Sequence, residues 1–198
     1  MVTLANLLDK AGITLPEITE HLESLPHPVR IAQTVEINKR QQMKLWLVAE
    51  NSGHALDMTY VVPEKAKPFE FFPFEGKNSL PLFTRFQKVF YRLPDSSCGG
   101  YNNQPMAWLT GPGYYVAGIS PKNPQEIEVD YMRVPDQKPA GWPAIVPNRG
   151  WWGMVYGGTK DYLRWVSKDV VIGRATKGGV EPMPNWFVLC RKDPNVGA

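Results

Sequence analysis

The chain has 198 residues, enough for one domain with a sizeable core, and its 43% hydrophobic and 21% charged residues are typical of a globular protein. Its 22 basic and 19 acidic residues are mixed without long runs of like charge, which argues against a nucleic-acid partner. No apolar run approaches the roughly 20 residues that cross a bilayer. Because the first residues also lack a signal-peptide pattern, we expect a cytoplasmic protein without integral membrane association.

The first quarter of the chain predicts helices. Thr3 can cap a first helix, and Thr14 with Glu17 has the spacing of a capping box at the start of a second. Residues 29–51 predict a third helical segment, which either continues through Asn38 or breaks near it. We therefore expect an N-terminal helical cap over residues 1–55.

The next segment is rich in aromatic residues and proline. Residues 69–74 alternate imperfectly, and Pro73 favours an edge strand or an extended segment. The apolar residues of 82–90 follow a helical period, so we expect a short helix capped by Ser79. A strand over residues 86–93 is the alternative.

The second half of the chain is predicted to be β-structure. Ile127, Val129 and Tyr131 alternate with acidic residues, which is typical of a half-buried strand. Residues 135–149 form a loop rich in Pro and Gly. Further strands are expected over residues 101–104, 106–110, 114–119 and 151–156.

The end of the chain contains three short apolar runs within residues 161–192. A tight connection at 167–169 separates the first two, and a longer loop from Lys177 with Pro182 and Pro184 precedes the third. This ending resembles the closing hairpins of lipocalin-like (calycin) barrels, in particular the plastid lipid-associated or fibrillin type. There a Tyr-Leu-x-x-x-Leu-Arg-Ile-x-Arg-Gly strand precedes a Phe-Val-Leu strand. The resemblance implies an architecture and includes no catalytic motif.

The spacing of these elements suits seven or eight strands. We predict a mainly β (α+β) protein, with an antiparallel lipocalin-like barrel or strongly curved sheet over residues 56–198. The N-terminal helical segment is expected to form one compact unit with it.

Aromatic residues are concentrated in the β half and either fill a solid core or line a ligand cavity. We expect Tyr115, Tyr131 and Trp165 to be wall residues, because their strands are apolar enough to be buried. Arg133 shares the phase of Tyr131 and is the expected polar anchor for an anionic head group. Surface ion pairing is the alternative for it, as it is for the other charged residues on the predicted strands, which are Asp130, Arg164, Arg174 and Arg191.

Cys98 precedes two glycines, and His54 could in principle activate its thiol as a nucleophile. The alternative is an incidental thiol beside a turn. We expect Cys98 and Cys190 to remain unbridged. No spacing indicates a metal site or a cofactor, and no catalytic residue is identified.

Three functions fit this sequence. The first is binding of a small hydrophobic or amphipathic molecule in the barrel without catalysis. The second is an isomerase, cyclase or hydrolase acting on a hydrophobic metabolite in the same cavity. The third is a protein–protein interaction module with Trp142 and 151–152 as exposed anchors. A converging acid, base and inward Arg would favour the enzyme, and a solid core with an exposed aromatic patch would favour the module.

Overall fold

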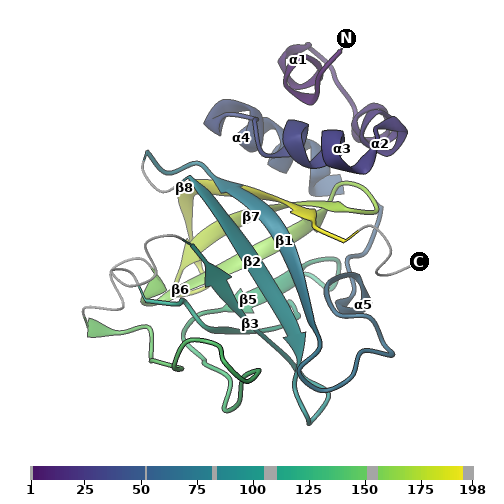
Figure 1. The fold of residues 1–198 in the computed structure, drawn as a ribbon. Helices are drawn as coiled ribbons and strands as arrows, with labels where there is room; N and C mark the ends of the chain where they lie inside the picture. Colours follow the sequence, from purple (N-terminus) through teal and green to yellow (C-terminus); the bar gives the residue numbers. More distant parts are fainter. Residues whose placement is uncertain (1, 52, 82–83, 105–110, 151–155, 194–198) are drawn as a thin grey trace.

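The computed structural model describes residues 2–51, 53–81, 84–104, 111–150 and 156–193. Within them, eight antiparallel strands form a closed barrel in which each strand pairs with the next and β1 pairs with β8 (Figure 1). The predicted mainly β fold with an N-terminal helical segment is therefore confirmed. The strands are β1 (Phe71–Asn78), β2 (Arg85–Arg92), β3 (Cys98–Asn103), β4 (Tyr115–Ile119), β5 (Ile127–Asp130), β6 (Thr159–Trp165), β7 (Val170–Lys177) and β8 (Glu181–Arg191).

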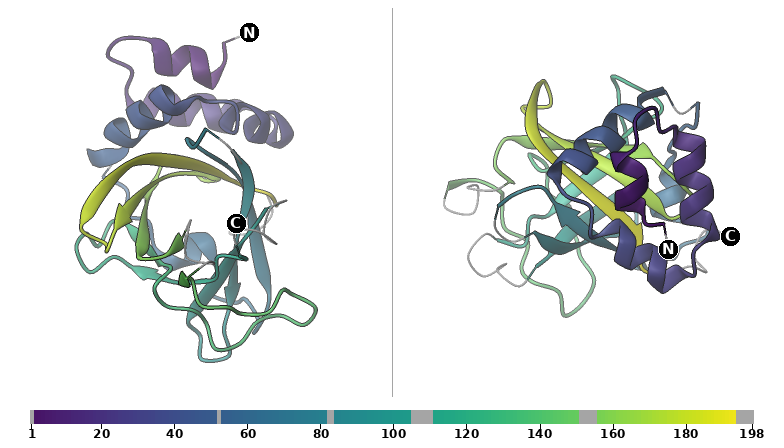
Figure 2. Two further views of the ribbon diagram at one scale, coloured as in Figure 1. Left: turned by 90° about the vertical axis from the view of Figure 1, so that its left-hand side faces the viewer. Right: turned by 90° about the horizontal axis from the view of Figure 1, so that it is seen from above.

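The first four helices lie together on one side of the barrel (Figure 2). They are α1 (Leu4–Asp9), α2 (Leu15–Ser24), α3 (His27–Thr34) and α4 (Lys39–Val48), and a single 3₁₀ turn (Ala49–Asn51) follows. Asn38 separates α3 from α4, because its side chain accepts a hydrogen bond from the Gln41 amide at 3.1 Å. The capping box of Thr14 and Glu17 is also present, so both boundary signals in the sequence were informative.

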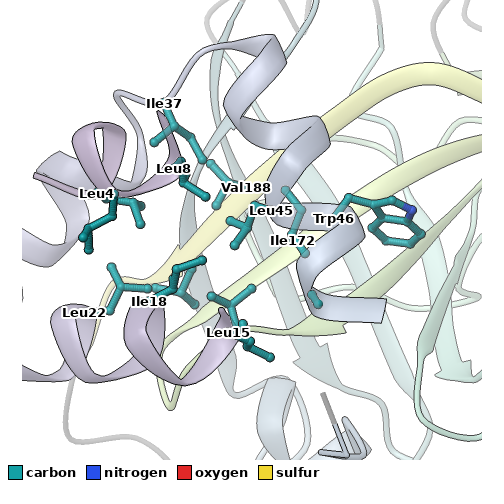
Figure 3. Packing of buried hydrophobic residues seen from close by; sticks show 14 of the residues in the cluster. Leu4, Leu8, Leu15, Ile18, Leu22, Ile37, Leu45, Trp46, Ile172 and Val188 are labelled. Carbon is teal, nitrogen blue, oxygen red and sulfur yellow. The ribbon is translucent and has the colours of Figure 1, made fainter. Parts of the chain in front are cut away.

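The helices bury an aliphatic surface against the outer face of β7 and β8. Figure 3 shows Ile18 and Leu45 from the helices beside Ile172 and Val188 from the strands. All four side chains are fully buried. β7 and β8 are consequently apolar on both faces where the helices cover them, since one face looks into the barrel and the other lies under the helices.

Three predictions about β1 and β2 had different outcomes. Pro73 lies inside a barrel strand and not on an edge, because its carbonyl accepts from the Lys192 amide at 2.9 Å at the end of the β1–β8 ladder. The N–H and C=O of one strand residue point toward the same neighbouring strand. The N–H that Pro73 lacks would therefore also lie on the β8 side, at the end of that ladder, so few ladder bonds are lost. The helix predicted after Ser79 is wrong, whereas the alternative strand corresponds to β2.

The predicted loop after Lys177 is shorter than expected, because Pro182 and Pro184 belong to β8. They occupy the part of β8 that extends beyond its pairing with β1, which ends at the Asn78–Phe187 pair. Proline is tolerated there because that side of the strand needs no ladder donor. The strand predicted at 106–110 and the start of the one at 151–156 lie outside the described residues.

A short helix, α5 (Met58–Val61), closes one end of the barrel. Leu56, Val61 and Val62 belong to the same apolar cluster as the inward side chains of the barrel. Arg92 fixes this segment by donating to the Val62 and Pro63 carbonyls at 3.2 and 2.7 Å. In the part of the chain that the structure describes, no helix has the length and apolar character needed to cross a membrane.

Candidate functional site

A cavity of about 300 Å³ lies inside the barrel, at the end opposite α5. Its inner part is formed by buried residues, among them Lys88, Asn102 and Tyr131, which are 1%, 2% and 3% exposed. Its outer part is formed by half-buried residues such as Leu80 and Met183. This gradient indicates a pocket that opens at one end and is closed at its base. The other lining residues are Asn78, Phe86, Gln104, Tyr156, Thr159, Asp161, Ala175, Asn185, Trp186 and Phe187.

Lys88 is the centre of a polar cluster at the base of the cavity. Its Nζ atom lies 3.1 Å from Asp161 Oδ2, 2.5 Å from the Tyr131 hydroxyl and 3.5 Å from Asn102 Oδ1. Asn102 also donates to the Tyr131 hydroxyl at 2.8 Å. Lys88 and all three of its partners line the cavity, so a bound molecule would meet these groups directly.

Three aromatic rings also face the Lys88 ammonium, which remains part of the cavity lining. Its Nζ lies 4.8 Å from the centre of the Tyr115 ring, 4.9 Å from that of Tyr131 and 5.0 Å from that of Phe187. Each ring face attracts the cation, and together the rings reduce its contact with water. The cluster therefore combines one buried ion pair with an apolar wall.

Burial opposes the charge on both members of this pair. It lowers the pKa of Lys88, although the Asp161 carboxylate acts in the opposite direction. It raises the pKa of Asp161, although Lys88 and the Tyr131 hydroxyl stabilise the carboxylate. The two shifts bring the pKa values of an amine and a carboxyl group toward each other, so moving a proton between them costs less here than in water. Desolvation also raises the pKa of Tyr131 well above its usual value, which keeps the phenol protonated.

Glycines on the inner faces of the strands leave room for the rings. A Cβ atom on Gly100 would lie 2.2 Å from the Tyr115 ring, and one on Gly173 would lie 2.1 Å from the Phe187 ring. At Gly118, on β4, the same atom would meet nothing within 4 Å. Gly100 and Gly173 are therefore required for the positions of two rings that surround Lys88.

The structure brings two of the four predicted ligand-binding residues to the Lys88 cluster. Tyr131 lines the cavity and contacts Lys88 directly. Tyr115 is fully buried behind it, with its hydroxyl donating to the Val89 carbonyl at 2.9 Å, and presents its ring to the ammonium. Tyr115 thus packs behind the lining residues and contacts Lys88, but it does not itself line the cavity.

The other two predicted residues lie elsewhere. Arg133 is exposed in a turn, because β5 ends at Asp130 and the alternation that aligned Arg133 with Tyr131 ends with it. Trp165 lies at the far end of β6, where its ring stacks on His54 with 4.0 Å between ring centres. Among the described residues, neither one is part of the cavity lining.

The remaining charged candidates on strands are also not among the described residues that line the cavity. Asp130 pairs with Lys160 at 3.0 Å on the outer face. Arg164 stacks over Trp46 of the helices at 3.7 Å. Two further arginines complete the set. Arg174 donates to the Met183 carbonyl at 3.1 Å, and Arg191 is buried against α5, 3.7 Å from Asp169.

The arrangement around Cys98 does not support a nucleophilic thiol. Burial raises the pKa of Cys98 to about 12, so the thiolate is disfavoured at neutral pH. His54 instead stacks on the ring of Trp165, the last residue of β6. Cys98 and Cys190 are both free thiols, the first inside the barrel and the second in the cluster under the helices.

Trp142, the proposed anchor of an interaction module, packs on the protein itself. Its ring lies 5.4, 5.3 and 4.4 Å from the rings of Phe71, Tyr91 and Tyr101. It attaches the 135–149 loop to the outer face of the barrel and is only half exposed. The other proposed anchor, at 151–152, lies outside the described residues.

Sequence reasoning missed Lys88 and Asp161, although a signal for each was present. In the strand alternative for residues 86–93, Lys88 has the phase of Phe86 and Phe90, so a lysine lies on an apolar face. Asp161 similarly has the phase of Leu163. A charged residue in the middle of an apolar strand face marks an inward, paired position.

Comparison with known proteins adds no assignment, because the chain matches no protein-family model, no curated protein and no solved structure. The resemblance of its last strands to lipocalin-like barrels therefore stays a prediction. In the described residues, no group of three or more His, Cys, Asp and Glu side chains is placed to hold a metal ion. The class that fold and cavity define is a closed antiparallel barrel with a polar cluster at the base of an aromatic pocket.

Proposed function

We propose that this protein binds a small, largely apolar and electrically neutral molecule in its barrel, with one polar end placed at the base of the cavity. The observation that carries the proposal is the cavity of about 300 Å³ whose apolar walls converge on Lys88 and Asp161. Ligand pockets commonly combine an apolar lining with a few polar groups that fix orientation. The lipocalin-like resemblance of the last strands is consistent with this role.

The charge balance of the lining favours a neutral ligand over an anionic one. Lys88 and Asp161 are the only charged residues among the described residues that line the cavity, and they compensate each other. An anionic head group would place a second negative charge beside one ammonium in a site shielded from water, which is unfavourable. A hydroxyl or carbonyl oxygen can instead bond to Lys88, Tyr131 or Asn102 without adding charge.

Fluorescent probes of similar size and different charge test this proposal. We expect neutral N-phenyl-1-naphthylamine to bind with increased fluorescence and anionic anilinonaphthalene sulfonate to bind at least about tenfold more weakly, a difference of about 1.4 kcal/mol. Ala175→Trp fills the cavity from β7 and should abolish binding of the neutral probe. Val180→Trp, at a position that is 75% exposed in the neighbouring turn, is the matched control.

Arg133→Leu distinguishes this cavity from the anchor predicted by sequence. Since Arg133 is exposed outside the lining, the substitution should leave the affinity of both probes unchanged. Equal binding of the neutral probe to wild type and Ala175→Trp would contradict the proposal. So would tighter binding of the anionic probe that depends on Arg133.

A further inference from the structure

We propose that the polar end of the bound molecule is an aldehyde or ketone, and that Lys88 forms a reversible imine with it. This inference rests on the proposed binding function and names the chemistry of the ligand. It starts from the position of Lys88, the only described lysine that lines the cavity. Its amine nitrogen lies at the closed base, where the end of an inserted molecule would stop.

Burying a lysine costs more desolvation free energy than is needed to bind a simple polar group. Replacing a buried ion pair by apolar residues often leaves stability unchanged or increases it, so the Lys88–Asp161 pair is not needed to fill the barrel. A neutral Asn or Gln could donate a hydrogen bond to a ligand oxygen with less desolvation. What a lysine adds is a nucleophilic nitrogen, provided that its environment allows the neutral amine to form.

The surroundings of Lys88 meet that condition. The rings of Tyr115, Tyr131 and Phe187 shield the ammonium from water, and the Asp161 carboxylate lies 3.1 Å away as a proton acceptor. Desolvation lowers the pKa of Lys88 and raises that of Asp161, which reduces the cost of transferring the proton. The Tyr131 hydroxyl stays protonated and can donate to the carbonyl oxygen as negative charge develops there.

The reaction is balanced within the site. Asp161 takes one proton from the Lys88 ammonium, and the nitrogen lone pair forms the N–C bond while the C=O π electrons move to oxygen. That proton, and then a second one from nitrogen, pass through Asp161 to the oxygen. The C–O bond breaks and water leaves. The products are a protonated imine paired with Asp161 and one water molecule, and no oxidant or reductant is consumed.

Borohydride trapping with 2-naphthaldehyde tests the inference on the wild-type protein. We expect reduction to leave one naphthylmethyl group on Lys88, located by peptide mass spectrometry, at a higher yield than on any other lysine, because the cavity holds the aldehyde beside this amine. Lys77 is the internal comparator: its pKa is also lowered by desolvation, but it lies outside the cavity. An excess of 2-naphthylmethanol, which fits the same space and has no carbonyl, should protect Lys88 and leave Lys77 unaffected.

The outcomes separate the two proposals. Lys88→Arg keeps the charge and removes the nucleophile, so it should lose the adduct. If wild-type protein binds 2-naphthylmethanol but gives no adduct, or labels Lys77 as readily as Lys88, the imine is wrong and the binding function stands. If neither naphthalene compound binds, both proposals are wrong.

Discussion

Two apolar clusters share the wall formed by β7 and β8, and they are built from different residues. The outer cluster joins the helices to the barrel mostly through aliphatic side chains such as Leu45, Ile172 and Val188. The inner cluster is rich in aromatic rings such as Tyr115 and Phe187, and it surrounds an ion pair and a cavity. Aliphatic side chains interdigitate to native packing density, whereas rigid rings held beside glycines leave an opening. Of the two, only the inner cluster is organised around polar groups that face a space.

The largest loss of stability is expected in the inner cluster, for the substitution Lys88→Met. The change leaves Asp161 buried without its partner, which should lower the free energy of unfolding by about 3–5 kcal/mol at pH 7. Lys77→Met, at a half-buried position on the outer face of β1, should cost less than about 0.5 kcal/mol. Urea denaturation of both variants measures the difference. The double variant Lys88→Met with Asp161→Leu should recover most of the loss, and failure to do so would mean that the pair is not the cause.

The stability of the single variant Lys88→Met should depend on pH in a predictable direction. Burial already raises the pKa of Asp161 in the folded protein, and removal of Lys88 takes away the neighbour that lowers it. The folded state then binds the proton more tightly than the unfolded state does. The contribution of Asp161 to the free energy of unfolding should be greatest below the unfolded aspartate pKa of about 3.9, and it should fall as pH rises through the pKa of Asp161 in the folded protein. The deficit relative to wild type should thus widen between pH 4 and pH 7, and a constant deficit would contradict it.

In the outer cluster, Leu45→Ala should cost about 2–4 kcal/mol, because its fully buried side chain would leave a cavity between α4 and the barrel. Leu47→Ala is the matched control, since Leu47 is 58% exposed on the same helix and should cost less than about 0.5 kcal/mol. Probe binding by the Leu45 variant should be retained under native conditions. Loss of binding with little loss of stability would show that the two clusters are not independent.

Gly173→Ala tests the packing of the inner cluster. The new methyl group meets the Phe187 ring and should displace it toward the cavity, costing about 1–3 kcal/mol and weakening the neutral probe. Gly118→Ala adds the same methyl group where space is open, so its effect should be close to zero or slightly stabilising. Similar unfolding midpoints for the two variants would be evidence against a tight fit at Phe187.

The smallest expected effect is at a helix boundary. Asn38→Ala removes the side-chain acceptor of the Gln41 amide and should cost about 1 kcal/mol. Asn38→Ser keeps an acceptor and should retain most of the stability, as measured by thermal unfolding. The loss should not alter probe binding, because Asn38 contributes to the helices alone.

The helix boundaries and the alternating strands could be predicted from the sequence better than the residues of the site. The capping boxes and the period-two run from Ile127 are local, so they survive without tertiary information. The direction of a side chain on β7 or β8 cannot be predicted locally, because both faces of these strands are apolar where the helices cover the outside. On β6 the shared phase of Asp161 and Leu163 was a signal, but each face carries a charge, Arg164 outward and Asp161 inward, so the sequence did not show which face enters the barrel. At β2 the same apolar residues fit a helical and a strand period, which hid Lys88.

The prolines of β8 have a consequence for self-association. The segment Glu181–Asn185 extends past the last described pairing with β1, so the rim of the cavity includes a strand edge with one unpaired side. Such an edge is where a second chain could add a strand and start aggregation. Pro182 and Pro184 have no amide hydrogen to offer to an incoming strand. The mouth of the barrel can therefore stay open to a small molecule while remaining a poor template for another copy of the chain.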